Sequence, residues 1–194
     1  MKKFIGILLA LCCFTICFAE ENNKKLVLKG EKNGIEIKID FSNYLYDKNT
    51  YKSYDDLSNE DQLQLMFKPL LLSIKNGTTK SIETSRAYDV LSIVVAGKQF
   101  DITMTSITGD YPKLIRKGVT FDCSLPTGLS YETLFLSAAN QEIKNKYTLI
   151  GVLCMLINYY YDGIMDYEKV KNNLTGYFSI TWLGEEIELT PVVE

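Results

Sequence analysis

The sequence of 194 residues contains no histidine. Without an imidazole, the chain cannot form a Ser-His-Asp or a Cys-His catalytic site, and the usual histidine-containing zinc site is excluded as well. The chain also lacks the glycine-rich motifs of dinucleotide-binding folds and P-loops, and it lacks the nucleophile elbow of α/β-hydrolases. We therefore expect neither a cofactor nor a metal, and the commonest hydrolase mechanisms are closed to this chain.

An excess of positive charge is also missing, since 21 Lys and Arg face 24 Asp and Glu and the net charge is −3. Nucleic-acid binding and polybasic membrane binding both need a basic surface, so we expect neither. A hydrophobic content of 46% is ordinary for a globular protein and argues against disorder. Beyond the N-terminal segment no apolar run reaches the roughly 20 residues that a membrane span needs, so we expect no transmembrane segment in the mature chain.

The first 19 residues have the pattern of a secretory signal peptide. Met1-Lys2-Lys3 is positively charged, Phe4 to Ala19 is apolar or small, and Glu20 follows directly. This pattern predicts export, with cleavage after Ala19, to the periplasm, the cell envelope or the outside of the cell. The mature chain would then be residues 20–194.

Two other fates of this segment were weighed. A bacterial lipoprotein would keep Cys12 or Cys17 as an acylated first residue, but Leu11 and Ile16 stand where a small residue is usual. An uncleaved anchor is the third alternative, although the apolar run is short for a bilayer. Simple cleavage is the prediction, and lipid anchoring is the alternative.

Strict alternation of apolar and polar residues predicts several strands. In residues 35–41 the apolar side chains fall on one face, and Asn33-Gly34 before them is a strong hairpin signal. Similar patterns predict hairpins over 89–104 and 177–190, a strand over 118–125, and strands on both sides of an Asn76-Gly77 turn. We therefore expect residues 20–194 to form a single, mainly β domain, an antiparallel immunoglobulin-like β-sandwich with one or two short helices; α+β is the alternative.

Three segments are harder to assign. Residues 57–67 predict either a helix capped by Ser58 or a turn followed by a strand, and residues 130–146 contain a possible helix start at Ser130. Residues 148–161 are almost continuously apolar, so periodicity does not separate a buried strand from a buried helix. Because the neighbouring strands are clear, we expect a central strand covered on both faces.

Two cysteines, Cys123 and Cys154, lie beyond the signal segment. Each sits among apolar residues, and disulfides persist in exported proteins, so a bridge between them is one alternative. Two buried free thiols that behave as small hydrophobic side chains are the other.

Tyrosines gather in two stretches, and they are the candidate binding residues. Aromatic rings beside carboxylates and amides provide large contact areas for sugars, peptides or protein partners. Tyrosines that merely cover a core are the competing interpretation. The candidates are Tyr44, Tyr46, Tyr51, Tyr54, Tyr159 and Tyr160.

The expected function is non-enzymatic. We expect an exported cell-envelope protein that acts by binding or structural interaction, with a glycan, a peptide or an envelope protein as partner. One alternative is an envelope lipoprotein with a scaffold role. The other is a hydrolase that uses a pair of carboxylates, since such pairs are assembled by the fold and leave no spacing in the sequence.

Overall fold

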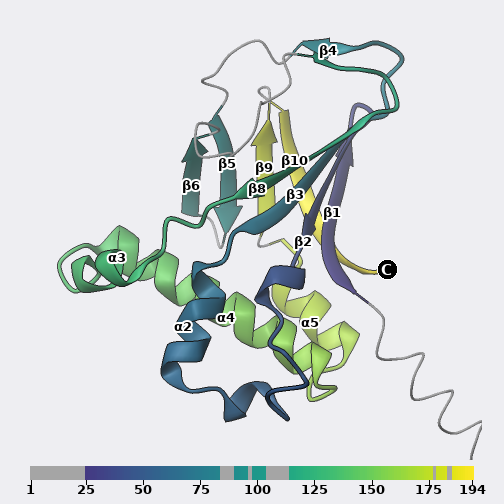
Figure 1. Ribbon diagram of the computed structural model, residues 1–194. Helices are drawn as coiled ribbons and strands as arrows, with labels where there is room; N and C mark the ends of the chain where they lie inside the picture. Colours follow the sequence, from purple (N-terminus) through teal and green to yellow (C-terminus); the bar gives the residue numbers. More distant parts are fainter. Residues whose placement is uncertain (1–24, 84–89, 96–97, 104–113, 177, 183–184) are drawn as a thin grey trace, which may run out of the picture.

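The computed structural model describes residues 25–83, 90–95, 98–103, 114–176, 178–182 and 185–194. An antiparallel sheet with the strand order β6-β5-β9-β10-β1-β2-β3-β8 curls into a half-barrel, and the helices gather at one end of it (Figure 1). The strands are β1 (Leu26–Lys32), β2 (Ile35–Asp40), β3 (Leu70–Asn76), β5 (Val90–Val95), β6 (Lys98–Thr103), β8 (Thr120–Leu125), β9 (Phe178–Trp182) and β10 (Glu185–Val193).

The predicted immunoglobulin-like β-sandwich is wrong, and the protein is α+β. The strands expected to form two facing sheets instead join edge to edge in one curled sheet. Helices take the place of the second layer, and their apolar side chains fill the concave side of the sheet. A curled sheet and a sandwich use the same half-buried strands, so alternation alone does not distinguish them.

The predicted hairpins are confirmed. Asn33 and Gly34 both have positive φ angles, 54° and 78°, as a two-residue type I′ turn between β1 and β2 requires. The β5–β6 and β9–β10 pairs also form, while the tips of their turns lie outside the described residues. Gly30 has a packing role, because a Cβ there would collide with the backbone carbonyl oxygen of Glu188 on β10.

Asn76 and Gly77 do not make the predicted hairpin turn, because Asn76 still pairs with Ile35 at the end of β3 and the Gly77 N–H donates to the Gly34 carbonyl oxygen at 2.7 Å. The strand after it, β4 (Ile82–Glu83), pairs with β7 (Leu114–Ile115) in a separate two-stranded sheet. Asn76 is buried, and its amide donates to the carbonyl oxygens of Lys80 and Ile115 at 2.9 and 2.8 Å. Its side chain therefore ties this small sheet to the end of β3.

Two of the uncertain segments are helical. Ser58 caps α2 (Asn59–Phe67) by accepting the Asp61 N–H, and Ser130 caps α3 (Tyr131–Leu136) by accepting the Thr133 N–H. A side-chain oxygen at this position satisfies a backbone donor that the helix itself leaves unpaired. The helical alternatives at Ser58 and Ser130 are therefore confirmed.

The expected central strand over 148–161 is wrong, because these residues lie in the long helix α4 (Gln141–Tyr161). Asn140 caps its start, and Gly163, with a φ of 73°, follows its end. Tyr147, Ile150, Cys154 and Ile157 recur at helical spacing on a buried face. Neighbouring helices cover other sides of α4, so these sides are apolar as well. The apolar residues of the segment therefore show no clear helical period in the sequence.

One hydrophobic core joins the sheet to the helices. It unites Leu28, Ile37, Ile74 and Trp182 of the sheet with Leu153 of α4, and α5 (Tyr167–Leu174) adds two more buried side chains. The domain bounds 20–194 stay a prediction. None of the helices in the described ranges has the length and apolarity to cross a bilayer. The predicted signal segment, residues 1–19, lies outside the described residues.

Candidate functional site

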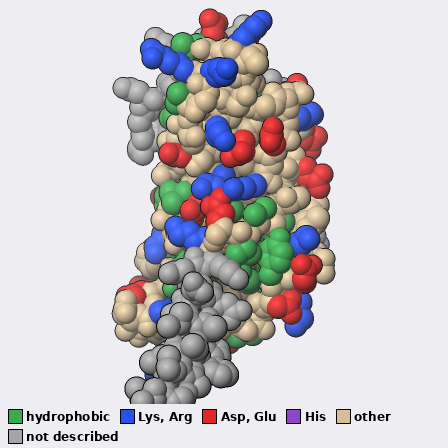
Figure 2. Space-filling model, turned by 90° about the vertical axis from the view of Figure 1, so that its right-hand side faces the viewer, with side chains coloured by type: hydrophobic (Ala, Val, Ile, Leu, Met, Phe, Trp, Pro, Cys, Tyr) green, Lys and Arg blue, Asp and Glu red, His purple; other side chains and the backbone are tan. Residues whose placement is uncertain are grey.

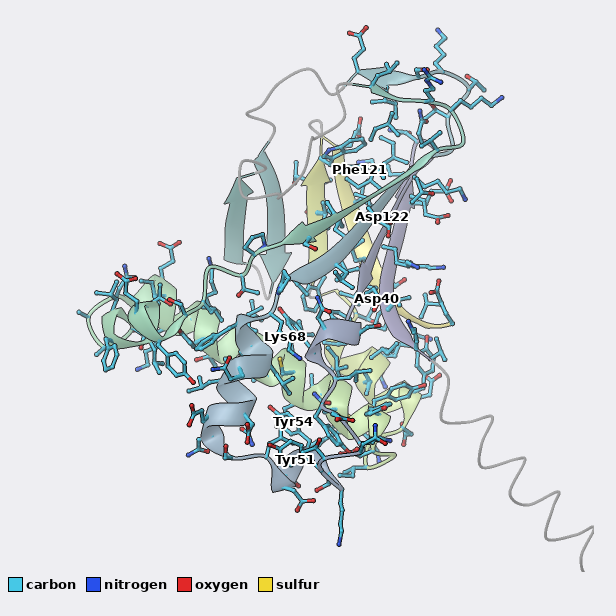
Figure 3. All side chains as sticks on the ribbon, viewed as in Figure 1. Asp40, Tyr51, Tyr54, Lys68, Phe121 and Asp122 are labelled. Carbon is cyan, nitrogen blue, oxygen red and sulfur yellow. The ribbon has the colours of Figure 1, made fainter. Side chains whose placement is uncertain are left out.

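The two tyrosine stretches, more than a hundred residues apart in the chain, meet at the C-terminal end of α4. Tyr54 and Tyr159 contact edge to face with ring centroids 6.0 Å apart, and Tyr46 and Tyr161 do so at 5.9 Å. Figure 3 places Tyr51 and Tyr54 together at the helical end of the molecule. This tyrosine cluster, a small second core, comprises Tyr46, Tyr51, Tyr54, Leu57, Leu65, Met155, Tyr159 and Tyr161.

Polar groups of α4 fasten the segment that follows β2 to this cluster. Asn158 is fully buried; its amide donates to the Tyr44 carbonyl oxygen at 2.8 Å, and its side-chain oxygen accepts the Tyr46 N–H at 3.1 Å. Asp162 accepts the Tyr46 hydroxyl with one oxygen and the Tyr54 N–H, at 2.9 Å, with the other. The contacts explain how residues 44–54, with little regular structure, are held in place.

The candidate tyrosines differ in their access to solvent. Tyr44, Tyr46 and Tyr54 are buried, whereas Tyr51, Tyr159 and Tyr160 are half-buried. Tyr44 belongs to the main core and Tyr160 packs against it, so neither is part of the tyrosine cluster. The structure therefore gives most of these rings a packing role, and binding by the exposed edges of the others stays a prediction.

Burial changes the chemistry of these phenols. Burial is the main cause that raises the pKa of Tyr54 to about 12, and it also raises the pKa of Tyr46, where the hydrogen bond to Asp162 adds to the effect. The Tyr44 hydroxyl is buried and has no hydrogen-bond partner within the described part of the chain. Neutral phenols of this kind suit a packed interior.

Acidic side chains near the cluster have local partners. Asp55 accepts the Tyr159 hydroxyl at 2.9 Å, and Asp56 closes a capping box on Ser53. Asp61 accepts the Ser58 hydroxyl at 2.6 Å, and hydrogen bonds from Ser58 and Tyr51 lower the pKa of Asp61. These acids start short helices and anchor the cluster.

Cys123 and Cys154 are free thiols, on β8 and α4 respectively. Both contribute to the main core, Cys154 as a fully buried residue and Cys123 as a half-buried one. Burial raises the pKa of each thiol to about 12. Such thiols carry little thiolate at neutral pH and are poor nucleophiles.

A second candidate surface lies on the sheet face that points away from the helices. The side chains there line an open hollow of about 360 Å³, which we call the charged hollow. Mixed positive and negative side chains of this kind cross the face of the molecule seen in Figure 2. The lining residues are Lys29, Glu36, Lys38, Ser73, Lys75, Thr120, Asp122 and Glu194.

The floor of the charged hollow is a row of side chains in register across four strands. Lys29 lies opposite Lys38, Lys38 opposite Ser73, and Ser73 opposite Asp122. Within this row, positive charge is therefore concentrated on β1 and β2, and the row ends in a carboxylate on β8. The third lysine of the hollow, Lys75 on β3, pairs with Glu36 at 3.7 Å in the neighbouring row. Ser73 donates to Asp122 at 2.5 Å, and this bond orients the carboxylate.

Lys29 and Lys38 carry like charges directly opposite each other in the sheet, and such charges repel. The negative charge of Glu194 offsets this repulsion. Its carboxylate pairs with the Lys29 ammonium and also lies 3.4 Å from that of Lys38. The hydrogen bond between the Lys29 ammonium and the Glu194 carboxylate raises the pKa of Lys29 and lowers the pKa of Glu194. Lys29 and Glu194 therefore stay ionised at neutral pH.

The charged hollow was not identified as a site from the sequence. The alternation of Glu36, Lys38 and Asp40 with isoleucines predicts only a half-buried strand of an antiparallel sheet. The signal that could have revealed the site is that three predicted strands each carry charged side chains at their polar positions. Without the strand order, nothing shows that these residues meet.

In comparisons with known proteins, no family model, no curated protein and no solved structure matches the chain.

Proposed function

We propose that the protein is an exported cell-envelope protein that acts by binding a charged, polar ligand in the charged hollow. The observation that carries the proposal is the concentration of three ammonium groups, three carboxylates and two hydroxyls in one hollow. Polar groups that converge in a concave surface fix the orientation of a ligand and provide specificity. Export follows from the signal pattern of residues 1–19.

Rigidity of the hollow supports binding. Its floor is formed by the inner strands β1, β2 and β3 and by the edge strand β8. The other face of the inner strands packs against the main core through Leu28, Ile37, Ile39 and Ile74. Side chains that project from such strands are held in fixed positions, and less entropy is lost when a ligand binds to them.

A hydrolase is less well supported than a binding protein. A carboxylate-pair mechanism needs one carboxyl group whose pKa is raised, so that it can donate a proton near neutral pH. In the charged hollow, the pKa of Glu194 is lowered by its lysine partners. A permanent carboxylate beside ammonium groups suits ionic recognition better than proton transfer.

The proposal is tested by measuring binding of the purified protein to immobilised panels of envelope glycans and synthetic peptides. We expect the wild type to bind one class and Ser73→Arg to lose that binding, because a long side chain at the centre of the row fills the hollow. Thr148→Arg, on an exposed position of α4, is the matched control and should bind like the wild type. Binding that survives Ser73→Arg, or no binding to either panel, contradicts the proposal.

The tyrosine prediction is tested in the same experiment. Tyr159→Ala removes a half-buried ring of the tyrosine cluster without touching the charged hollow. If this variant is folded and loses binding while Ser73→Arg keeps it, the ligand site is the tyrosine cluster.

The predicted cleavage of the signal segment is tested separately by mass spectrometry of the exported protein. Cleavage after Ala19 gives a chain that begins at Glu20, as we propose. A chain that begins with an acylated Cys12 or Cys17 supports the lipoprotein alternative, and a chain that keeps Met1 supports the uncleaved anchor.

A further inference from the structure

We infer that the ligand of the charged hollow is a short peptide with free ends, three or four residues long, whose carboxylate is held by Lys29 and Lys38 and whose ammonium is held by Asp122. This inference rests on the proposed function and names the ligand class. It follows from the order of charges along the row and from the spacing of the strands.

The charges are separated along the row. Lys29 and Lys38 are neighbours on β1 and β2, Ser73 is uncharged, and Asp122 stands at the far end on β8. A ligand that lies across the strands therefore meets two ammonium groups at one end and a carboxylate at the other. An extended molecule with a single charge of each sign at opposite ends is complementary to this order.

The distances select the length of the ligand. Neighbouring strands are about 4.8 Å apart, so Asp122 lies roughly 10 Å from Lys38 and roughly 14 Å from Lys29, measured across the strands. An extended peptide spans about 3.3–3.6 Å per residue, so three or four residues cover this span. A single amino acid is too short to reach both ends, and a long peptide puts one of its ends outside the row.

Glu194 acts in this scheme as an internal substitute for the ligand carboxylate. Its side chain already pairs with both Lys29 and Lys38, and its backbone is fixed by two hydrogen bonds to Lys25, at 2.9 and 3.0 Å. The ligand carboxylate must share or replace these ion pairs. Removing the charge of Glu194 should therefore strengthen binding, whereas removing the lysine charges should weaken it.

The middle of the row adds groups that suit a peptide backbone. The hydroxyl of Ser73 lies in the middle of the row, and that of Thr120 lies beside its Asp122 end on β8; hydroxyls both donate and accept hydrogen bonds. Peptide amide groups have the same two requirements.

The test is isothermal titration of the purified protein with trialanine, N-acetyl-trialanine, trialanine amide, alanine and hexa-alanine. We expect trialanine to bind best, with at least about a tenfold loss on blocking either end, as for a lost charge-assisted hydrogen bond. Lys29→Gln with Lys38→Gln should abolish the preference for a free carboxylate, and Asp122→Asn should abolish the preference for a free amine. Glu194→Gln should bind trialanine about tenfold more tightly than the wild type does.

Matched controls separate these effects from a general change of charge. Lys32→Gln removes a lysine that pairs with Glu185 outside the hollow, and Glu83→Gln removes an exposed acid on β4. Both should bind trialanine like the wild type.

Two failures are distinguishable. If end-blocked peptides or glycans bind in a way that Ser73→Arg abolishes, the charged hollow is a binding site and the peptide-end inference is overturned. If none of the peptides binds and the panels also give no signal that depends on Ser73, the proposed function is overturned together with the inference. Weaker trialanine binding by Glu194→Gln overturns the role given to Glu194.

Discussion

The hydroxyl of Tyr46 donates a hydrogen bond to the carboxylate of Asp162, across 116 positions of the chain. The second oxygen of the same carboxylate accepts the backbone N–H of Tyr54 at 2.9 Å. One side chain at the end of α4 thus holds two points of the segment between β2 and α2. These two hydrogen bonds to Asp162 hold the tyrosine cluster in place, and the tyrosine rings alone do not.

Asp162→Ala should destabilise the protein by about 2 kcal/mol, because it removes a charged acceptor and leaves the buried Tyr46 hydroxyl without that partner. Urea unfolding followed by circular dichroism measures the change. Glu168→Ala, at an exposed position of α5, is the control and should shift the free energy of unfolding by less than about 0.5 kcal/mol. Equal changes in the free energy of unfolding for the two substitutions would show that the hydrogen bonds of Asp162 do not stabilise the fold.

Tyr44→Phe and Tyr46→Phe should have opposite effects on stability. The Tyr44 hydroxyl is buried without a described partner, so its removal should stabilise the fold by about 1 kcal/mol. The Tyr46 hydroxyl bonds to Asp162 and to the Lys52 carbonyl oxygen, so its removal should cost about 1–2 kcal/mol. Denaturant midpoints of the two variants give the signs, and a loss of stability in Tyr44→Phe would reveal a partner for that hydroxyl.

Stability should decline in alkali, from about pH 9 upward. Burial raises the folded-state pKa of Cys123, Cys154 and Tyr54 to about 12, from ordinary values of 9.0 for a thiol and 10.0 for a phenol. Between pH 9 and 12 these groups ionise in the unfolded chain first, and the free energy of the unfolded state falls relative to that of the folded state. Their contribution is therefore complete below pH 9 and disappears as pH rises toward 12.

Urea midpoints measured from pH 7 to 11.5 should show this decline. Tyr54→Phe removes one of the titrating groups, so its profile should fall less steeply above pH 10 than the wild-type profile does. A parallel decline in the two proteins would mean that Tyr54 ionises equally in both states.

In a chain of residues 20–194, the thiols should be unreactive until the protein unfolds. Cys123 and Cys154 are free and their raised pKa values leave little thiolate near pH 7.5. A thiol-specific dye should label the native protein slowly and should titrate two thiols in urea without reductant. No labelling in urea would show instead that the two cysteines have formed the alternative disulfide.

Local signals in the sequence were sufficient for many of the elements. The Asn33-Gly34 turn, the alternating isoleucines of β2, and the caps Ser58 and Ser130 act within a few residues, and the structure has each as predicted. The helix α4 was mistaken for a strand because its neighbours cover it on several sides. Its length and the Asn140 cap were the signals that pointed to a helix.

Neither candidate site could be assembled from the sequence. The tyrosine residues were identified, but their burial depends on Asn158 and Asp162, which carry no recognisable motif. The charged hollow needs the order of β1, β2, β3 and β8, and the last of these strands joins the sheet from a distant part of the chain. Residues that line a sheet face become neighbours only when the strands are aligned.

The sequence by itself determined the alternation of the strands, their tight turns and the start of two helices, because short-range sterics and hydrogen bonds act between residues near in the chain. It also excluded histidine chemistry and carried the export pattern. The tertiary structure decided that the strands form one curled sheet, that α4 fills it, and that Lys29, Lys38, Ser73 and Asp122 align. These outcomes depend on the burial of apolar surface across the whole chain, which no local pattern specifies.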